Sequence, residues 1–93
     1  MTKKTFLESK KIMGKKLDSE WVFLNLENGV YYGLNETGSL IWDELKSQKD
    51  FLAVVEKLET VFQVDRPTAE KDLRQFLKKL KEEGLAKIEA FVP

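Results

Sequence analysis

The feature that most constrains this 93-residue chain is a hairpin pattern in its first third. Residues 21–26 are rich in aromatic and aliphatic side chains, and residues 30–34 repeat this character after Asn28 and Gly29. Such residues favour strands, and an Asn-Gly pair accepts the positive φ angles of a tight two-residue turn. We therefore predict two antiparallel strands joined by a turn at Asn28 and Gly29.

A third strand is expected upstream, at residues 11–17, with Asp18 and Ser19 forming its turn. An up-down-up order of the three strands places residues 21–26 in the middle of the sheet. The strand at residues 30–34 then lies at an edge, where its outer backbone N–H and C=O groups have no partner. Side chains alternate between faces along a strand, so the sheet has apolar residues on both faces.

The rest of the chain predicts three helices, each with a recognisable start. Asn35, Asp50 and Asp65 are suitable N-cap residues, and Gly84 follows the last apolar turn of the third helix, where a left-handed residue belongs. Residues 85–88 are expected to form a short strand or an extended tail. The predicted fold class is therefore α+β, a three-stranded antiparallel meander followed by three helices.

The third helix is amphipathic, with a core-facing stripe and two polar flanks. Phe76 lies on the stripe and is either a core residue or part of a groove wall. Both flanks are either ordinary solvated edges or the borders of a binding groove. The flanks consist of Asp72, Gln75 and Lys79 on one side, and of Arg74 and Lys81 on the other.

Composition excludes several kinds of chemistry. The chain has no Cys and no His, so disulfides, a zinc site of the usual Cys/His type and a His-activated nucleophile are all excluded. Its glycines form no phosphate-binding loop. We therefore predict no enzymatic activity, no metal and no cofactor. Sixteen Lys and Arg residues balance sixteen Asp and Glu residues, which disfavours general nucleic-acid binding.

The length suits a single domain, 1–93. No apolar run is long enough to span a bilayer and no secretory signal is visible, so a cytoplasmic location is expected. Residues 1–16 carry six Lys and one Glu, whereas residues 17–45 carry six acidic and no basic residues. Residues 1–10 are expected to form a flexible tail, the alternative being an arm that lies against the acidic middle of the chain.

Two motifs in this chain resemble the PqqD-like family. Its members are the peptide chaperone of pyrroloquinoline-quinone biosynthesis and the recognition elements that act on ribosomally made, modified peptides (RiPPs). Residues 47–50 depart from the pattern of the quinone branch, so the chain is most similar to the stand-alone leader-binding protein of lasso-peptide biosynthesis. The motif residues are Tyr31, Tyr32, Gly33, Leu34, Asn35, Thr37, Gly38, Ile41 and Trp42, and then Asp72, Phe76, Leu77, Leu80, Gly84 and Leu85.

The resemblance implies a winged-helix-like fold that binds the leader segment of a precursor peptide. The leader would add as a strand beside the third strand, in a groove against the third helix, and would be passed to a leader peptidase and a cyclase. The family's aspartate corresponds to Asp72, which selects the flank with Gln75 and Lys79. The expected peptide-binding residues are Val30, Tyr31, Tyr32, Gly33, Leu34, Asp72, Gln75, Phe76, Lys79 and Leu80.

Each residue has an expected role in this hypothesis. Backbone groups of residues 30–33 pair with the leader, and Gly33 permits close approach because it has no Cβ. Asp72 and Lys79 make ionic or polar contacts with leader side chains. Phe76 and Leu80 line an apolar pocket for an aromatic or aliphatic anchor.

Three alternatives to this hypothesis stay open. The chain could serve as the peptide chaperone of pyrroloquinoline-quinone biosynthesis. It could be a winged-helix DNA-binding module, although acidic residues interrupt the basic patch on the third helix. It could also have only a structural role and form oligomers through its exposed edge strand.

Overall fold

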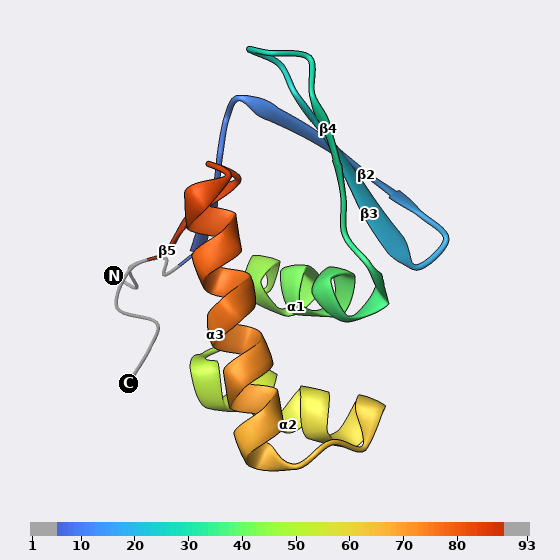
Figure 1. The fold of residues 1–93 in the computed structure, drawn as a ribbon, viewed down its shortest axis with the longest axis vertical. Coiled ribbons are helices and arrows are strands. Elements are labelled where there is room, and N and C mark those ends of the chain that lie inside the picture. Colours follow the sequence, from blue (N-terminus) through green and yellow to red (C-terminus); the bar gives the residue numbers. More distant parts are fainter. Residues whose placement is uncertain (1–5, 89–93) are drawn as a thin grey trace.

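The computed structural model describes residues 6–88 and shows a three-stranded sheet and three helices around a shared core (Figure 1). The predicted α+β order of three strands followed by three helices is confirmed. Of the two expectations for residues 85–88, the short strand forms, as β5, and one further short strand, β1, precedes the three predicted ones. The elements are β1 (Phe6–Glu8), β2 (Ile12–Leu17), β3 (Glu20–Asn25), β4 (Tyr31–Gly33), α1 (Glu36–Lys46), α2 (Phe51–Phe62), α3 (Arg66–Glu82) and β5 (Ala86–Ile88).

The main sheet is an antiparallel meander in the order β2-β3-β4, as predicted. Leu17 pairs with Glu20, so the predicted residues Asp18 and Ser19 form the turn between β2 and β3. Asp18 has a φ of 57°, which Asp tolerates better than most residues. With β3 in the middle, β4 lies at the edge of this sheet.

The connection between β3 and β4 differs from the predicted two-residue turn at Asn28 and Gly29. The backbone N–H of Asn25 donates to the carbonyl oxygen of Val30 at 2.9 Å, so residues 26–29 form a four-residue loop. The side chain of Asn25 accepts hydrogen bonds from two backbone N–H groups of this loop, at 2.9 and 3.3 Å. This capping by an Asn side chain stabilises the longer loop.

A second, two-stranded sheet connects the two ends of the described chain. β1 pairs antiparallel with β5, with Leu7 opposite Lys87, and the backbone N–H of Ser9 donates to the carbonyl oxygen of Leu85 at 2.9 Å. Residues 6–8, which were expected within a flexible tail, therefore form a strand. Residues 1–5 of that expected tail lie outside the described residues.

The three helices begin at the predicted caps. The side chains of Asn35, Asp50 and Asp65 each accept a hydrogen bond from the backbone N–H three residues later, at 2.8–2.9 Å. These bonds satisfy N–H groups that have no partner within the helix. After α3, Gly84 takes a φ of 68°, and this turn leads the chain into β5.

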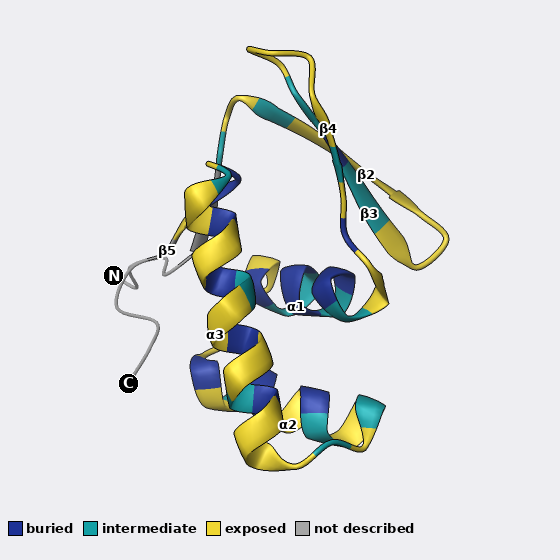
Figure 2. Ribbon diagram, viewed as in Figure 1, coloured by how far each residue is buried: buried dark blue, intermediate teal, exposed yellow. Residues whose placement is uncertain are grey.

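An aromatic cluster joins the inner face of the sheet to α1. The rings of Phe23 and Trp42 are fully buried, with centroids 4.5 Å apart, and Trp21 stacks on Phe23 at 5.7 Å. The indole N–H of Trp21 donates to Asp43 at 2.8 Å, and the ammonium of Lys16 binds the other oxygen of this carboxylate at 2.6 Å. Figure 2 shows that buried residues gather where the elements meet and that exposed residues cover the outer sides of the helices.

Two strand glycines provide a matched test of this inner-face packing. A Cβ at Gly14 would lie 2.8 Å from the ring of Phe23 and 3.3 Å from that of Trp21, whereas a Cβ at Gly33 would meet nothing within 4 Å. We expect Gly14→Ala to lower the free energy of unfolding by about 1–3 kcal/mol, because rigid core rings must move. Gly33→Ala should change it by less than about 1 kcal/mol. Urea denaturation measures both, and equal losses would contradict the packing described.

Candidate functional site

β4 presents an open backbone edge at two residues. Val30 and Leu34 form backbone hydrogen bonds to β3 at 2.9 and 2.8 Å. Backbone groups alternate in direction along an antiparallel strand, so Tyr32 also turns its N–H and C=O toward β3. Tyr31 and Gly33 turn theirs to the opposite side, where no strand among residues 6–88 pairs with them.

The predicted set of pairing residues therefore becomes smaller. Val30, Tyr31, Tyr32 and Gly33 were all expected to offer backbone groups to a guest strand. Both backbone groups of Val30 already have partners, since its N–H donates to the side chain of Asn28 at 2.9 Å and its carbonyl bonds to β3. The open edge consists of Tyr31 and Gly33, an assignment that depends on the register and hence on the four-residue loop.

Gly33 leaves the open edge of β4 without a side chain at one of its two positions. Its φ lies outside the left-handed region, and the space where a Cβ would lie is empty to 4 Å. The fold itself therefore makes no demand for glycine at this position. The missing side chain leaves room for another backbone to approach, as expected from the sequence.

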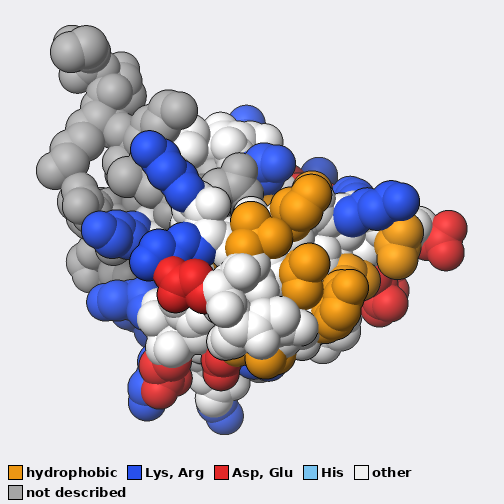
Figure 3. Space-filling view, turned by 90° about the horizontal axis from the view of Figure 1, so that it is seen from above, with side chains coloured by type: hydrophobic (Ala, Val, Ile, Leu, Met, Phe, Trp, Pro, Cys, Tyr) orange, Lys and Arg blue, Asp and Glu red, His pale blue; other side chains and the backbone are white. Residues whose placement is uncertain are grey.

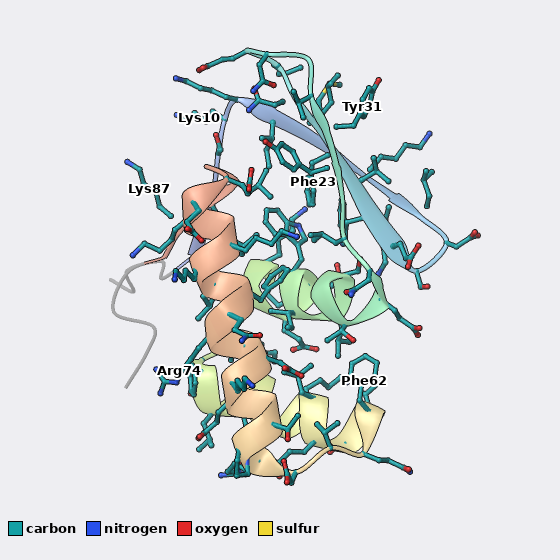
Figure 4. All side chains as sticks on the ribbon, in the orientation of Figure 1. Lys10, Phe23, Tyr31, Phe62, Arg74 and Lys87 are labelled. Carbon is teal, nitrogen blue, oxygen red and sulfur yellow. The ribbon has the colours of Figure 1, made fainter. Side chains whose placement is uncertain are left out.

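The two tyrosines of β4 point to opposite faces of the sheet. Tyr31 is 70% exposed and points outward from the outer face (Figure 4). Tyr32 lies opposite the buried Phe23 on the inner face, and its hydroxyl donates a hydrogen bond to the carboxylate of Glu83, just after α3. This bond, helped by loss of water and by the negative charge of Glu83, raises the pKa of Tyr32 above its ordinary value near 10.

A hollow of about 340 Å³ lies between the start of α1 and the side of α3. We call it the α1–α3 hollow. The chain enters its border directly from β4, because Asn35 is only two residues beyond Gly33. On the α3 side, the hollow is lined by the predicted flank residues Asp72, Gln75, Phe76 and Lys79. The structure thus brings this flank and the β4 edge into one region.

The α1–α3 hollow has opposite charges at its two ends. Asp72 and Lys79 are both exposed and lie seven residues apart, which is about 10 Å along a helix. Gln75 and the half-buried ring of Phe76 lie between them. A guest segment would therefore find a carboxylate, an apolar wall and an ammonium group in succession.

Phe76 is both a core contact and a wall of the α1–α3 hollow. Its ring packs against the core, and it also lines the hollow. A Cβ at Gly38 would lie 3.0 Å from this ring, so the lack of a side chain at Gly38 helps α1 and α3 to approach closely. The two readings of Phe76 that the sequence left open are thus both represented in the structure.

Two predicted site residues lie in the core. Leu80 is fully buried and does not line the α1–α3 hollow, so the structure places it beneath the groove wall and not on it. Leu34 is also buried, and its backbone N–H bonds to β3. The helical period puts Leu80 and Phe76 on one stripe. Only the packing of neighbouring elements decides that Leu80 is buried while Phe76 reaches the hollow.

Four further residues of the hollow lie at or near the start of α1. They were not predicted as site residues, and they are Asn35, Thr37, Gly38 and Ile41. The relevant signal was the N-cap motif that follows β4, because a helix that starts directly after an edge strand must begin beside that edge.

The described residues offer binding surfaces and lack a metal centre. Within residues 6–88, there is no group of three or more side chains suited to hold a metal ion. Each helix in that range is too short or too polar to span a bilayer. An open strand edge beside a hollow with opposite charges is an arrangement that suits a polypeptide in extended form.

Comparison with known proteins identifies the family. The family model described as "Coenzyme PQQ synthesis protein D (PqqD)" matches residues 20–86, which is well over half of the chain. The chain therefore belongs to the PqqD family, as the two sequence motifs predicted. A comparison with curated protein sequences found no match.

Two solved structures are similar over almost the whole chain. One, TbiB1 in complex with the TbiA(beta) leader peptide, is 36% identical with a TM-score of 0.79, and the match covers 94% of this chain and 99% of that one. The other, lasso peptide synthetase B1 complexed with the leader peptide, is 30% identical with a TM-score of 0.82, and the match covers 88% and 96%. This chain is thus similar to TbiB1 and to a lasso peptide synthetase B1, both determined with a leader peptide bound.

The contact between Tyr32 and Glu83 can be tested by titration. In a Tyr31→Phe background Tyr32 is the sole tyrosine, and Glu83→Gln should lower its pKa toward 10, as followed by tyrosinate absorbance. Because the folded pKa is raised, the contact stabilises the fold below about pH 10, and this contribution is lost as the pH rises through the folded pKa. Glu82→Gln is the matched control, and an equal shift in both variants would contradict the contact.

Proposed function

We propose that this protein binds the leader segment of a ribosomally made precursor peptide as an added strand along β4. The observation that carries the proposal is the open edge at Tyr31 and Gly33 beside the α1–α3 hollow. Two similar structures were determined with a leader peptide bound, which agrees with this role.

Affinity and selectivity come from different parts of the proposed site. Backbone hydrogen bonds to Tyr31 and Gly33 hold any extended segment regardless of its side chains. Selectivity comes from the α1–α3 hollow, where Asp72 favours a basic side chain, Phe76 an apolar one and Lys79 an acidic one. Alternate side chains of the leader would point toward this hollow, and the others toward the outer face with Tyr31.

In this proposal the protein recognises the precursor peptide and catalyses no covalent change in it. It holds the precursor for a leader peptidase and a cyclase in the cytoplasm, and thereby raises the local concentration of their substrate. An extended leader loses conformational freedom when it binds, so part of the interaction energy is spent on ordering it. A moderate affinity is therefore sufficient and also permits release.

The family model itself favours a second candidate, since its description names coenzyme PQQ synthesis. A chaperone of that pathway would use the same edge for a different precursor. The similarity to a lasso peptide synthetase B1 extends over 88% of the chain, and it favours the lasso-peptide role. Binding to labelled precursors of the two kinds separates these candidates. Duplex DNA added to the same titration tests the neutral chain for nucleic-acid binding.

Amide hydrogen exchange tests strand addition directly. We expect the TbiA(beta) leader peptide to slow exchange at the amides of Tyr31 and Gly33, because these would gain hydrogen bonds. The amides of Tyr32 and Leu34 should change little, since they already face β3. Peptide binding detected by fluorescence anisotropy without added protection at Tyr31 and Gly33 would exclude this mode of binding.

Charge reversal tests the α1–α3 hollow. Lys79→Glu should weaken binding of the same peptide about two- to fivefold, as expected for an exposed ion pair, and Asp72→Ala should have a similar effect. Lys78→Glu makes the same charge change one residue away, outside the hollow, and should leave affinity nearly unchanged. If Lys79→Glu and Lys78→Glu were equally harmless, Lys79 would have no part in the site.

A further inference from the structure

A second hollow, of about 510 Å³, lies at the C-terminal end of α3 and is bordered by lysines. We call it the lysine hollow. Its four lysines are Lys10, Lys11, Lys81 and Lys87. It shares no lining residue with the α1–α3 hollow, and Lys10 and Lys87 point to the side of α3 that lies away from β4 (Figure 4).

The fold itself brings these lysines together from the two ends of the sequence. They come from the loop between β1 and β2, from the last turn of α3, and from β5. The backbone of Leu85 ties these segments, since its carbonyl accepts the N–H of Ser9 at 2.9 Å and its N–H donates to Leu80 at 3.0 Å. Gly84, with its φ of 68°, makes the turn between α3 and β5. The concave shape is therefore built from hydrogen-bonded backbone.

One of the four lysines of the lysine hollow is in an ion pair within the described side chains. Among the side chains that the structure describes, only Lys11 of the four has a carboxylate partner, which is Glu27. The chain as a whole has a net charge of zero, so this cluster does not follow from a basic composition. Figure 3 shows one group of Lys and Arg side chains at the left of the view, and further basic side chains beside the hydrophobic group at the right.

We propose that the lysine hollow binds an acidic segment of a partner polypeptide. Ammonium groups attract carboxylates as point charges, and an anion there would relieve the mutual repulsion of the four lysines. Gly84 and Ala86, with the aliphatic stems of the lysines, provide an apolar floor for the CH₂ groups of Glu or Asp.

The same features argue against a nucleic-acid duplex. A duplex needs a series of cations along an extended surface, whereas these lysines surround a concave site. Glu82 and Glu83 interrupt the positive surface next to Lys81. The site lies apart from the β4 edge, so the inference stands whether or not the leader binds there.

Glu27 provides a variant that should gain function. Its carboxylate binds Lys11 and raises the pKa of that lysine, so it competes with any incoming acidic group. Glu27→Gln should therefore strengthen binding of an acidic peptide about two- to threefold. Glu56→Gln removes the same charge from the exposed side of α2 and should have little effect.

The experiment uses a fluorescein-labelled octapeptide of alternating Glu and Gly and a companion with Gln in place of Glu. Fluorescence anisotropy at low salt measures their binding to the full chain. The expected result is binding of the Glu peptide alone, weakened about tenfold or more by Lys10→Gln/Lys81→Gln/Lys87→Gln and reduced by added salt. All three lysines are exposed, and thermal unfolding by circular dichroism checks that the variant folds.

The control variant Lys49→Gln/Lys57→Gln/Lys78→Gln has the same net charge but an intact lysine hollow. An equal loss of affinity in both triple variants would overturn the proposal, since binding would then follow net charge alone. Absence of binding by the Glu peptide, or equal binding of the Gln peptide, would also overturn it. The proposal would also be overturned if a labelled DNA duplex bound more tightly than the Glu peptide and lost affinity only in the variant with Lys10, Lys81 and Lys87 replaced.

Discussion

The aromatic cluster of Trp21, Phe23 and Trp42 is the contact on which the rest of the structure depends. It fixes β3 to α1 through the inner face of the sheet, and Asp43 strengthens it by accepting hydrogen bonds from the indole of Trp21 and from Lys16. α1 packs against the face of β3, so it leaves the edges of the sheet free. β4 therefore pairs with β3 on one side, and no helix among the described residues covers its other side. The open backbone at the sheet edge is thus a consequence of how the core is built.

α3 borders both the α1–α3 hollow and the lysine hollow, at different places along its surface. One flank borders the α1–α3 hollow, and its C-terminal end borders the lysine hollow. Between them, Glu83 reaches Tyr32 and joins the end of α3 to β4. Only the stripe with Leu73, Leu77 and Leu80 is fully occupied by the core. α3 therefore contributes residues to two separate charged surfaces.

Local signals in the sequence were sufficient for most of the fold. The caps at Asn35, Asp50 and Asp65 and the turn at Asp18 depend on neighbouring residues, and all were predicted. The flank with Asp72 required the family motif in addition, since periodicity alone treats both flanks equally. What the sequence could not provide was long-range: the pairing of β1 with β5, and the burial of Leu80 next to the accessible Phe76. The four-residue loop was missed because the side chain of Asn25 acts as an acceptor.

The alternation of backbone direction along β4 also limits how a guest strand can shift. Only Tyr31 and Gly33 face outward, so a guest that slides by one residue keeps the spacing of its amides but turns every side chain to the other face. A slide by two residues restores the orientation and moves the guest about 7 Å along the edge. A guest added to this edge as proposed would therefore need its anchor side chains on alternate residues, and it would shift only in steps of two residues.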